Sequence, residues 1–464
     1  QSLLHRAYRL KNNLALLSEN SFYYDRKNGI VYYYPEDPEV LRHAACAYPL
    51  LENILECKGI AHLSLHGLAF TGTTSNFVTE NGYLTGQCGR IKKNDVGFLT
   101  HAAVHCESCS DVLIDGCRFY ELGADALNFN MRTTDLTVKN SVFSRIGATA
   151  IRVGRALSAW NEETNANYRI TIQNNRIDGT GLTYKSNVAV FLGVCMTARI
   201  CHNTIKNSCY SAISAGWSWA IATWPLGENR NLYDIEIAYN YIDNFMFGMR
   251  DGGAIYTLGG NAWAEYKEYF NFIHHNYMIV GETCGDSAVG YRVIYHDNGS
   301  SHWHDYDNVI LAREDLPPRD AFVIGGSRND LIERTYILNY RNDTPASVWR
   351  PDGEEGFIGV IEKDTVRNLS TENPLPDAVK EIISAAGCDS DKAPLPEKEH
   401  YKKTVTVYLD AANGKDENDG TASFPVRSLS RALMLTERAA EAETDCLFTV
   451  RFAPGVYPVN EALS

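Results

Sequence analysis

The stretch Asp251-Gly-Gly-Ala-Ile-Tyr-Thr-Leu-Gly259 is one copy of a pattern that recurs along the middle of the chain. Each copy has a small or β-branched residue, an apolar residue, a variable residue and then a stop. The other copies are Ala124-Asp-Ala-Leu-Asn-Phe-Asn130, Ala148-Thr-Ala-Ile-Arg-Val-Gly154, Asn187-Val-Ala-Val-Phe-Leu-Gly193, Tyr210-Ser-Ala-Ile-Ser-Ala-Gly216 and Tyr291-Arg-Val-Ile-Tyr-His-Asp297. Only one copy carries Asp-Gly-Gly in front, and only one ends in an aspartate followed by Asn-Gly-Ser-Ser. A repeat that changes character at one place usually does so for function.

A second type of strand alternates with the first. Its apolar and polar residues alternate, lead into Gly or Asn, and end on one further apolar residue, as at 63–70, 112–119, 136–143, 170–177, 198–205, 235–242 and 270–277. The interval from Phe119 to Phe143 is 24 residues, and the interval from Ile177 to Ile205 is 28. Short strands at this period, with no amphipathic helix between them, are typical of a parallel β-solenoid. The leucine spacing of a leucine-rich repeat and the roughly 40-residue blade of a propeller are both absent. We therefore predict an all-β fold, a right-handed parallel β-helix with loop insertions.

The Asn and Gly residues recur at the same place in each coil, which predicts a sharp turn there. Asn tolerates the left-handed conformation, and its side chain can bond to the coil above or below. Longer intervals place insertions near 154–168, 178–187, 216–231 and 259–268. Loops inserted repeatedly on one side of a rigid solenoid would build a cleft.

The flanking segments complete the expected domain organisation. Residues 1–49 combine a helix-like leucine stripe with a small β-hairpin around Lys27-Asn-Gly29, since Asn-Gly is a strong hairpin signal. Residues 50–365 form the β-helix, and residues 366–403 form a closing helix and linker. Residues 404–464 start a partial second module of the kind that caps the N-terminal end of a β-helix.

Composition limits the partners. The 464 residues carry a net charge of -14, which argues against nucleic acid or an anionic membrane as partner. No apolar run of transmembrane length and no signal-peptide pattern is present. Gln1 is not a methionine, so a leader could have been removed, and a secreted or a cytoplasmic location stays open.

Twelve cysteines raise the question of a metal site. Cys106-Glu-Ser-Cys109, with His101 and His105 close by, could suit zinc. No second pair of cysteines follows at that spacing, so buried free thiols are expected instead. The sequence indicates no metal and no cofactor.

Four features together resemble the large bacterial right-handed parallel β-helix glycoside hydrolases, most closely glycoside hydrolase family 141. They are the 22–35 hairpin, the 210–219 stretch Tyr-Ser-Ala-Ile-Ser-Ala-Gly-Trp-Ser-Trp, the 251–259 motif, and Tyr295-His-Asp-Asn-Gly-Ser-Ser301. The resemblance covers roughly residues 20–390. It implies hydrolysis of a fucoside or xylan-like plant or host glycan, because the family contains α-L-fucosidase and xylanase activities.

Two departures from that family stand out. Residues 404–464 look like the family's opening segment, yet here they come last, so the chain is either a fragment spanning two modules or a permuted one. In addition, family members often have Asp-Glu-Gly-Ser where Asp297 is followed here by Asn298. If the glutamate were the working acid, this copy would be impaired.

By resemblance, Asp251 and Asp297 are the two carboxyl groups that glycoside hydrolysis needs. Such groups stand roughly 5 Å apart in retaining enzymes and roughly 6.5–9.5 Å apart in inverting ones. Aligning Ile255 with Ile294 puts Asp251 before one strand and Asp297 at the end of the next, which predicts roughly 20 Å between them. A bulge at Gly252-Gly253 could fold Asp251 inward. Turn-forming aspartates are the alternative interpretation of both residues.

The same alignment predicts the substrate contacts. Trp217, Trp219 and His302 fall at the Asp297 end of the sheet, where the aromatic rings could stack on a sugar or pack under a lid. Arg152, Tyr256 and Tyr295, with Ser214, share one repeat position and should line one outer face, either as sugar contacts or as solvated side chains. His101, which precedes the first full coil, is a further candidate contact.

Two other functions stay open. A polysaccharide lyase would need a basic residue and commonly clustered acids for calcium, and the negative net charge would repel acidic sugars. A non-catalytic carbohydrate-binding or structural solenoid is the other alternative, since the fold alone does not establish hydrolysis.

Overall fold

The computed structural model describes residues 12–39, 49–75, 87–89, 91–93, 96–98, 101–155, 165–217, 232–259, 270–281, 292–297, 300–313, 320–325, 330–340, 346–349, 359–361, 366–389, 403–442 and 446–453. The predicted residues Trp219 and Asn298 and the first eleven residues of the expected N-terminal helix lie outside these ranges. Just before the hairpin, a 3-10 turn, η2, spans Leu14–Leu16. Strands β1 (Ser21–Asp25) and β2 (Ile30–Tyr34) pair antiparallel to form the hairpin.

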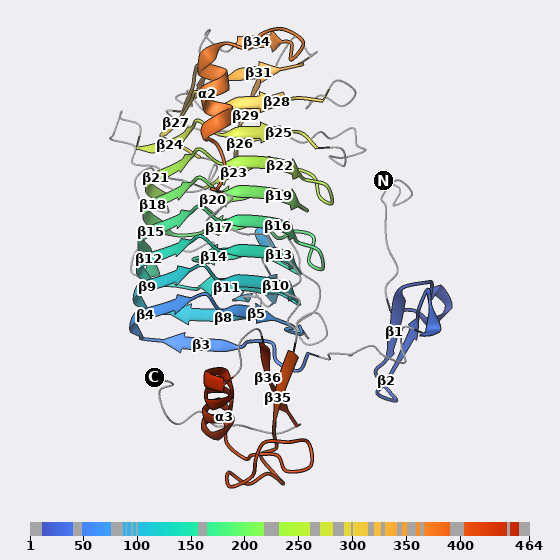
Figure 1. Cartoon of the computed structure of the whole chain (residues 1–464). Helices are drawn as coiled ribbons and strands as arrows, with labels where there is room; N and C mark the ends of the chain where they lie inside the picture. The colour runs from blue at the N-terminus through green and yellow to red at the C-terminus, as the bar shows by residue number, and fades with distance from the viewer. Residues whose placement is uncertain are drawn as a thin grey trace. The chain divides into compact units, whose positions relative to one another are not determined.

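The chain folds into a right-handed parallel β-helix, as predicted, in which each coil contributes one strand to each of three parallel sheets (Figure 1). Sheet 1 consists of β3 (Leu55–Lys58), β8 (Ala102–Glu107), β11 (Asp125–Phe129), β14 (Ile151–Val153), β17 (Val190–Leu192), β20 (Ile213–Ala215), β23 (Ile255–Leu258), β26 (Arg292–Asp297), β29 (Asp320–Gly325) and β32 (Ala346–Trp349). Sheet 2 consists of β4 (Ala61–His66), β9 (Ser110–Asp115), β12 (Thr134–Lys139), β15 (Asn167–Gln173), β18 (Cys195–Cys201), β21 (Leu232–Ala238), β24 (Asn271–His274), β27 (Trp303–Tyr306), β30 (Asp330–Ile332) and β33 (Gly359–Ile361). Sheet 3 consists of β5 (Ala69–Thr71), β10 (Arg118–Leu122), β13 (Val142–Ile146), β16 (Arg176–Thr180), β19 (Thr204–Ser208), β22 (Tyr241–Phe245), β25 (Tyr277–Ile279), β28 (Val309–Leu311), β31 (Tyr336–Leu338) and β34 (Val366–Leu369).

The alternation of apolar and polar residues decides which side chains fill the interior. In sheet 2, the register pairs Val138 with Ile172, and Ile200 with Ile237, and all four side chains are fully buried. In sheet 3, Phe119 stacks on Phe70 and on Phe143, each at 4.9 Å between ring centroids. Identical positions on successive coils therefore build continuous apolar columns.

The turn between sheets 2 and 3 follows the prediction for Asn in part. Asn140 and Asn174 have φ values of 52° and 55°, in the left-handed region, but in later coils His202, Tyr239 and His275 take that conformation and the Asn comes next. The next residue of each turn forms an interior ladder, in which the side-chain oxygen of Asn240 accepts the backbone N–H of Asn203 at 3.0 Å. Its Nδ2 donates to the Ile200 carbonyl at 2.8 Å. The ladder runs through Asn175, Asn203, Asn240, Asn276 and Asn308.

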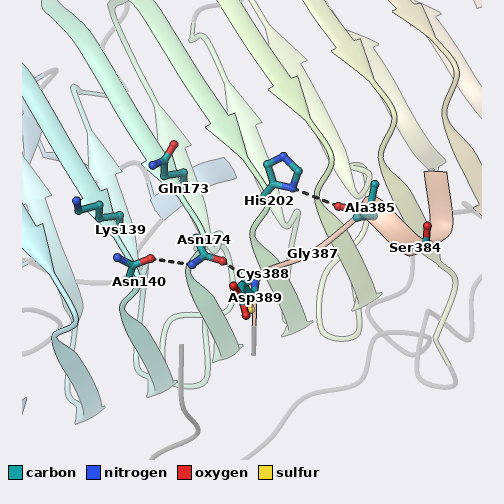
Figure 2. A pocket seen from close by; sticks show the side chains of 11 residues that line it. Lys139, Asn140, Gln173, Asn174, His202, Ser384, Ala385, Gly387, Cys388 and Asp389 are labelled. Carbon is teal, nitrogen blue, oxygen red and sulfur yellow. Dashed lines mark hydrogen bonds between the residues drawn. The ribbon is translucent and has the colours of Figure 1, made fainter. Parts of the chain in front are cut away.

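A closing segment runs back along the solenoid. Helix α2 (Asp377–Ala385) packs Val379 and Ile382 against Val309 and Leu338 of sheet 3. After the helix, the backbone N–H of Asp389 donates to the Asn174 side chain at 2.6 Å, which extends an outer row of amide contacts that starts at Asn140 (Figure 2). The segment is thus tied to side chains about 200 residues earlier in the chain.

Residues 394–464 form a second compact unit. Strands β35 (Lys403–Leu409) and β36 (Cys446–Phe452) pair in parallel, and helix α3 (Leu429–Ala442) connects them. Val407, Leu409, Val426 and Ala432 form its buried cluster. Within the described ranges, no helix has the length and hydrophobicity needed to cross a lipid bilayer.

Candidate active site

The predicted register of sheet 1 is confirmed. Ile255 lies opposite Ile294, and Leu258 lies opposite Asp297. Ser214, Tyr256 and Tyr295 are direct neighbours across strands, and Arg152 joins the same column through Phe191. The four predicted side chains therefore share one column of sheet 1.

This column is covered by protein. Arg152, Ser214 and Tyr256 are 2%, 0% and 0% exposed, so the solvated face that the sequence allowed is wrong for these three residues. The cover is the short turn η4 (Gln87–Gly89). Its Cys88 lies 3.1 Å from the Ser214 hydroxyl, and the Cys88 carbonyl accepts a hydrogen bond from Arg152 at 3.1 Å.

The guanidinium of Arg152 is occupied by protein partners. It donates to the buried Asp125 carboxylate at 2.7 Å, to Thr149 at 2.9 Å and to Asn187 at 2.8 Å. These contacts hold the guanidinium in place, and its bond to the Cys88 carbonyl ties η4 to the sheet.

Asp297 lies at the carboxyl end of β26, and its residue is 5% exposed. The hydroxyl of Tyr256 donates to its Oδ2 at 2.8 Å. Tyr295 stands beside Tyr256, with ring centroids 5.3 Å apart. Burial and the Asp297 carboxylate both raise the pKa of each tyrosine, so the two phenols stay protonated at neutral pH and can donate.

Asp251 sits in the turn before β23, with φ of 64°. Its backbone carbonyl accepts hydrogen bonds from Tyr210 at 2.7 Å and from Gln87 at 3.2 Å. Its side chain is 59% exposed and lies 3.9 Å from Arg292. Asp251 is thus the open member of the predicted pair and Asp297 the covered one.

The two glycines after Asp251 allow this turn to lie close to its neighbours. A Cβ on Gly252 would stand 2.8 Å from the Tyr210 ring and the Ser211 hydroxyl. A Cβ on Gly253 would stand 2.8 Å from the Val293 carbonyl of β26. Only glycine permits both approaches without a shift of the backbone.

Gln87 connects the two aspartates. Its Nε2 lies 3.5 Å from Oδ2 of Asp251, and its Oε1 lies 3.3 Å from the Tyr256 hydroxyl. The path from Asp251 to Asp297 crosses the Gln87 amide, which is about 2.3 Å wide, and then the Tyr256 hydroxyl, which bonds to Asp297 at 2.8 Å. The length of this path limits the separation of the two carboxylate oxygens to roughly 12 Å. The separation is therefore shorter than the roughly 20 Å that an extended path predicts. The residues Asp251, Asp297, Tyr256, Tyr295, Gln87 and Arg292 are called the aspartate cluster below.

The other predicted contacts lie in different surroundings. Trp217 is 1% exposed and packs edge-on against Phe191, with ring centroids 6.4 Å apart. His302 is 1% exposed and stacks on Phe270 at 4.6 Å. His101 is partly exposed and pairs with Glu52 at 3.1 Å. The buried rings of Trp217 and His302 belong to the protein interior.

The described ranges show no metal-binding cluster, since no group of three or more His, Cys, Asp or Glu side chains in them is arranged to hold an ion. Cys106 and Cys109 are buried free thiols. A surface hollow of about 600 Å³ lies between the outer amide row and the end of α2 with the segment that follows it (Figure 2), and it is lined by Lys139, Asn140, Gln173, Asn174, His202 and residues 384–389. None of the predicted site residues lines that hollow.

Sequence reasoning missed Gln87, Tyr210 and Arg292. Gln87 belongs to no repeat, so no periodicity could mark it. Tyr210 and Arg292 each belong to a repeat copy that the sequence analysis recognised. The register places both near Asp251 if the Gly252-Gly253 turn folds back onto the sheet.

Comparison with known proteins supports the class of fold. No family model matches the chain, and no curated protein matches its sequence. A solved structure titled "Glycoside hydrolase" superposes with a TM-score of 0.57 at 19% sequence identity. The match covers 81% of this chain and 59% of that one, so this chain spans little more than half of that protein's length. At this identity the likeness demonstrates the parallel β-helix fold and leaves the activity to be argued from the site.

Proposed function

We propose that this chain is a glycoside hydrolase that uses Asp251 and Asp297 as its two carboxyl groups. The observation that carries the proposal is the link from Asp251 through Gln87 and Tyr256 to Asp297, which limits the separation of the two carboxyl groups to roughly 12 Å. The likeness of fold to a structure titled "Glycoside hydrolase" supports the same class.

The environments of the two aspartates differ. Asp297 is nearly buried and is held by a hydrogen bond from Tyr256, so this fixed carboxyl group would serve as the nucleophile or base. Asp251, with its exposed side chain, would exchange a proton with the glycosidic oxygen or with water.

The substrate is proposed from the sequence motifs. Their resemblance to glycoside hydrolase family 141 favours a fucoside or xylan-like glycan. Arg292 beside Asp251 supplies a fixed cation with donors for sugar hydroxyls at the exposed end of the cluster.

The test is turnover of a panel of aryl α-L-fucosides, aryl xylosides and xylan by the wild type and by Asp297→Asn and Asp251→Asn. Each substitution keeps the shape of the side chain and removes the carboxylate, and we expect kcat to fall by at least roughly 1,000-fold for Asp297→Asn. Asp243→Asn in β22 of sheet 3 is the matched control and should keep full activity.

Two outcomes favour the alternatives. Unsaturated sugar products would identify a lyase. Saturable oligosaccharide binding by calorimetry without turnover, unchanged in Asp297→Asn, would identify a binding module.

A further inference from the structure

A chain of hydrogen bonds lies inside the solenoid directly behind Asp297. The Ser300 hydroxyl donates to the Asp297 backbone carbonyl at 2.8 Å, and the Thr257 hydroxyl lies 2.9 Å from the Ser300 hydroxyl. Nδ1 of His296 lies 2.8 Å from the Thr257 hydroxyl, and Nε2 of His296 lies 2.9 Å from Oδ2 of Asp305. Ser300, Thr257, His296 and Asp305 are all 0% exposed. Bulk solvent does not reach these groups, so the printed contacts decide how the protons are distributed among them.

Counting protons along the chain assigns each donor. A carbonyl oxygen can only accept, so the single proton of Ser300 points to Asp297. Ser300 must then accept from Thr257, which uses the single proton of Thr257. The Thr257 oxygen therefore accepts from His296, so Nδ1 carries a proton. If Ser300 donated to Thr257 instead, the Ser300 hydroxyl and the Asp297 carbonyl would lie 2.8 Å apart with no proton between them.

The other ring nitrogen faces the Asp305 carboxyl group. One proton must lie between Nε2 and Oδ2 at 2.9 Å, and an imidazole is more basic than a carboxylate by about two to three pKa units. His296 is therefore an imidazolium with both N–H groups bonded, and Asp305 is its counter-ion. Burial lowers the pKa of His296, but the carboxylates of Asp305 and Asp330 outweigh burial and raise it.

Two buried carboxyl groups lie near the His296 ring. The ionisable groups that face His296 are Asp305 on β27 and Asp330 on β30, which is also fully buried and accepts the Trp303 backbone N–H at 2.9 Å. The Trp303 ring lies 5.8 Å from the imidazole. A charged ring in this place is costly unless it is paired and hydrogen-bonded, and the chain meets both conditions.

We infer that His296 is a positioning residue, which acts through Thr257 and Ser300 to hold the backbone of Asp297 so that its carboxylate meets the Tyr256 hydroxyl. The inference rests on the proposed role of Asp297. The Ser300 N–H also donates to the Asp297 carbonyl, at 3.1 Å, so the turn after β26 is fixed by two bonds from one residue. The buried pair of His296 and Asp305 thus orients the Asp297 carboxylate at the edge of the sheet.

The test compares Thr257→Val with Thr257→Ser in the full chain. Valine keeps the branched shape and removes the link, and we expect kcat to fall roughly 10- to 100-fold with little change in KM, because a carboxylate displaced by a fraction of an ångström loses alignment. Serine restores the hydroxyl and should restore kcat. The matched control is His304→Gln, which breaks a half-exposed His–Glu pair on the outer face of β27 and should leave kcat unchanged.

A second measurement needs no substrate. In ¹⁵N-histidine-labelled wild type, the His296 ring should show two N–H protons at a pH above 6.5, the ordinary His pKa. A singly protonated ring there overturns the inference, as does a folded Thr257→Val variant with wild-type kcat and pH profile. Full activity of Asp297→Asn would overturn the proposed function instead, so the two failures are distinguishable. If Thr257→Val does not fold, the ring protonation of the wild type decides.

Discussion

The hydroxyl of Tyr256 donates a 2.8 Å hydrogen bond to the carboxylate of Asp297 on the neighbouring strand. The two residues are two positions apart in the register, since Tyr256 pairs with Tyr295 and Leu258 with Asp297. A phenol that is almost completely buried thus meets a carboxylate that is almost completely buried. The contact links two members of the aspartate cluster across neighbouring strands, and the first prediction depends on it.

Removing that hydroxyl should impair the site without disturbing its shape. For Tyr256→Phe we expect kcat/KM to fall roughly 10- to 100-fold, since a hydrogen bond to a charged group contributes about 1.5–3 kcal/mol. Tyr241→Phe, which removes a 3.3 Å bond to Asp243 in sheet 3, is the control and should keep the wild-type kcat/KM. An unchanged kcat/KM in Tyr256→Phe would contradict the role of Tyr256.

The buried pair of Arg152 and Asp125 should dominate the stability of the covered column. Arg152→Met leaves Asp125 buried without its partner, and we expect a loss of about 3–5 kcal/mol in the free energy of unfolding by urea denaturation. The same change should expose Cys88 to thiol reagents, because Arg152 holds its carbonyl. Arg169→Met breaks an exposed pair with Asp135 and should leave stability nearly unchanged. Equal losses in both variants would refute this account.

The interior asparagine ladder should tolerate no gap. Asn240→Ala leaves the Asn203 backbone N–H and the Ile200 carbonyl without their bonds, and we expect a loss of about 3 kcal/mol. Thr171→Ala, on the half-exposed outer side of β15, should cost much less. Calorimetric unfolding of both variants checks the difference.

The charge pair of His296 and Asp305 should appear in the pH dependence of stability. The pKa of His296 is raised in the folded state, so its contribution is fully present below the unfolded-state value of about 6.5 and is lost as pH rises through the folded-state value. We therefore expect the difference in unfolding free energy between wild type and His296→Gln to shrink at alkaline pH. The difference must be measured against the variant, since burial lowers the pKa of His274 and His275 and their contributions have the opposite sign. A difference that grows with pH would show that His296 folds as a neutral ring.

Much of the fold followed from local pattern. The recurrence of an apolar residue before a variable one predicted the pairing of Ile255 with Ile294, because identical positions on successive coils must stack. The Asn and Gly positions predicted the turns, because few residues adopt a left-handed backbone without strain. The resemblance of two motifs to a glycosidase family predicted Asp251 and Asp297 as the two carboxyl groups. The motifs did not predict the distance between them.

By itself, then, the sequence determined the coil, its register and the two copies that depart from the repeat. Only the tertiary structure decided what covers each column. Strand alternation predicts which side of a sheet a side chain faces. Whether another segment buries that side depends on contacts between residues far apart in the chain. Gln87 and Cys88 carry no periodicity, yet they cover Arg152 and Tyr256, and Gln87 contacts Asp251 across a sequence separation of 164 residues. The backbone of the Gly252-Gly253 turn approaches Tyr210 and β26 in space, and no local pattern reports that approach.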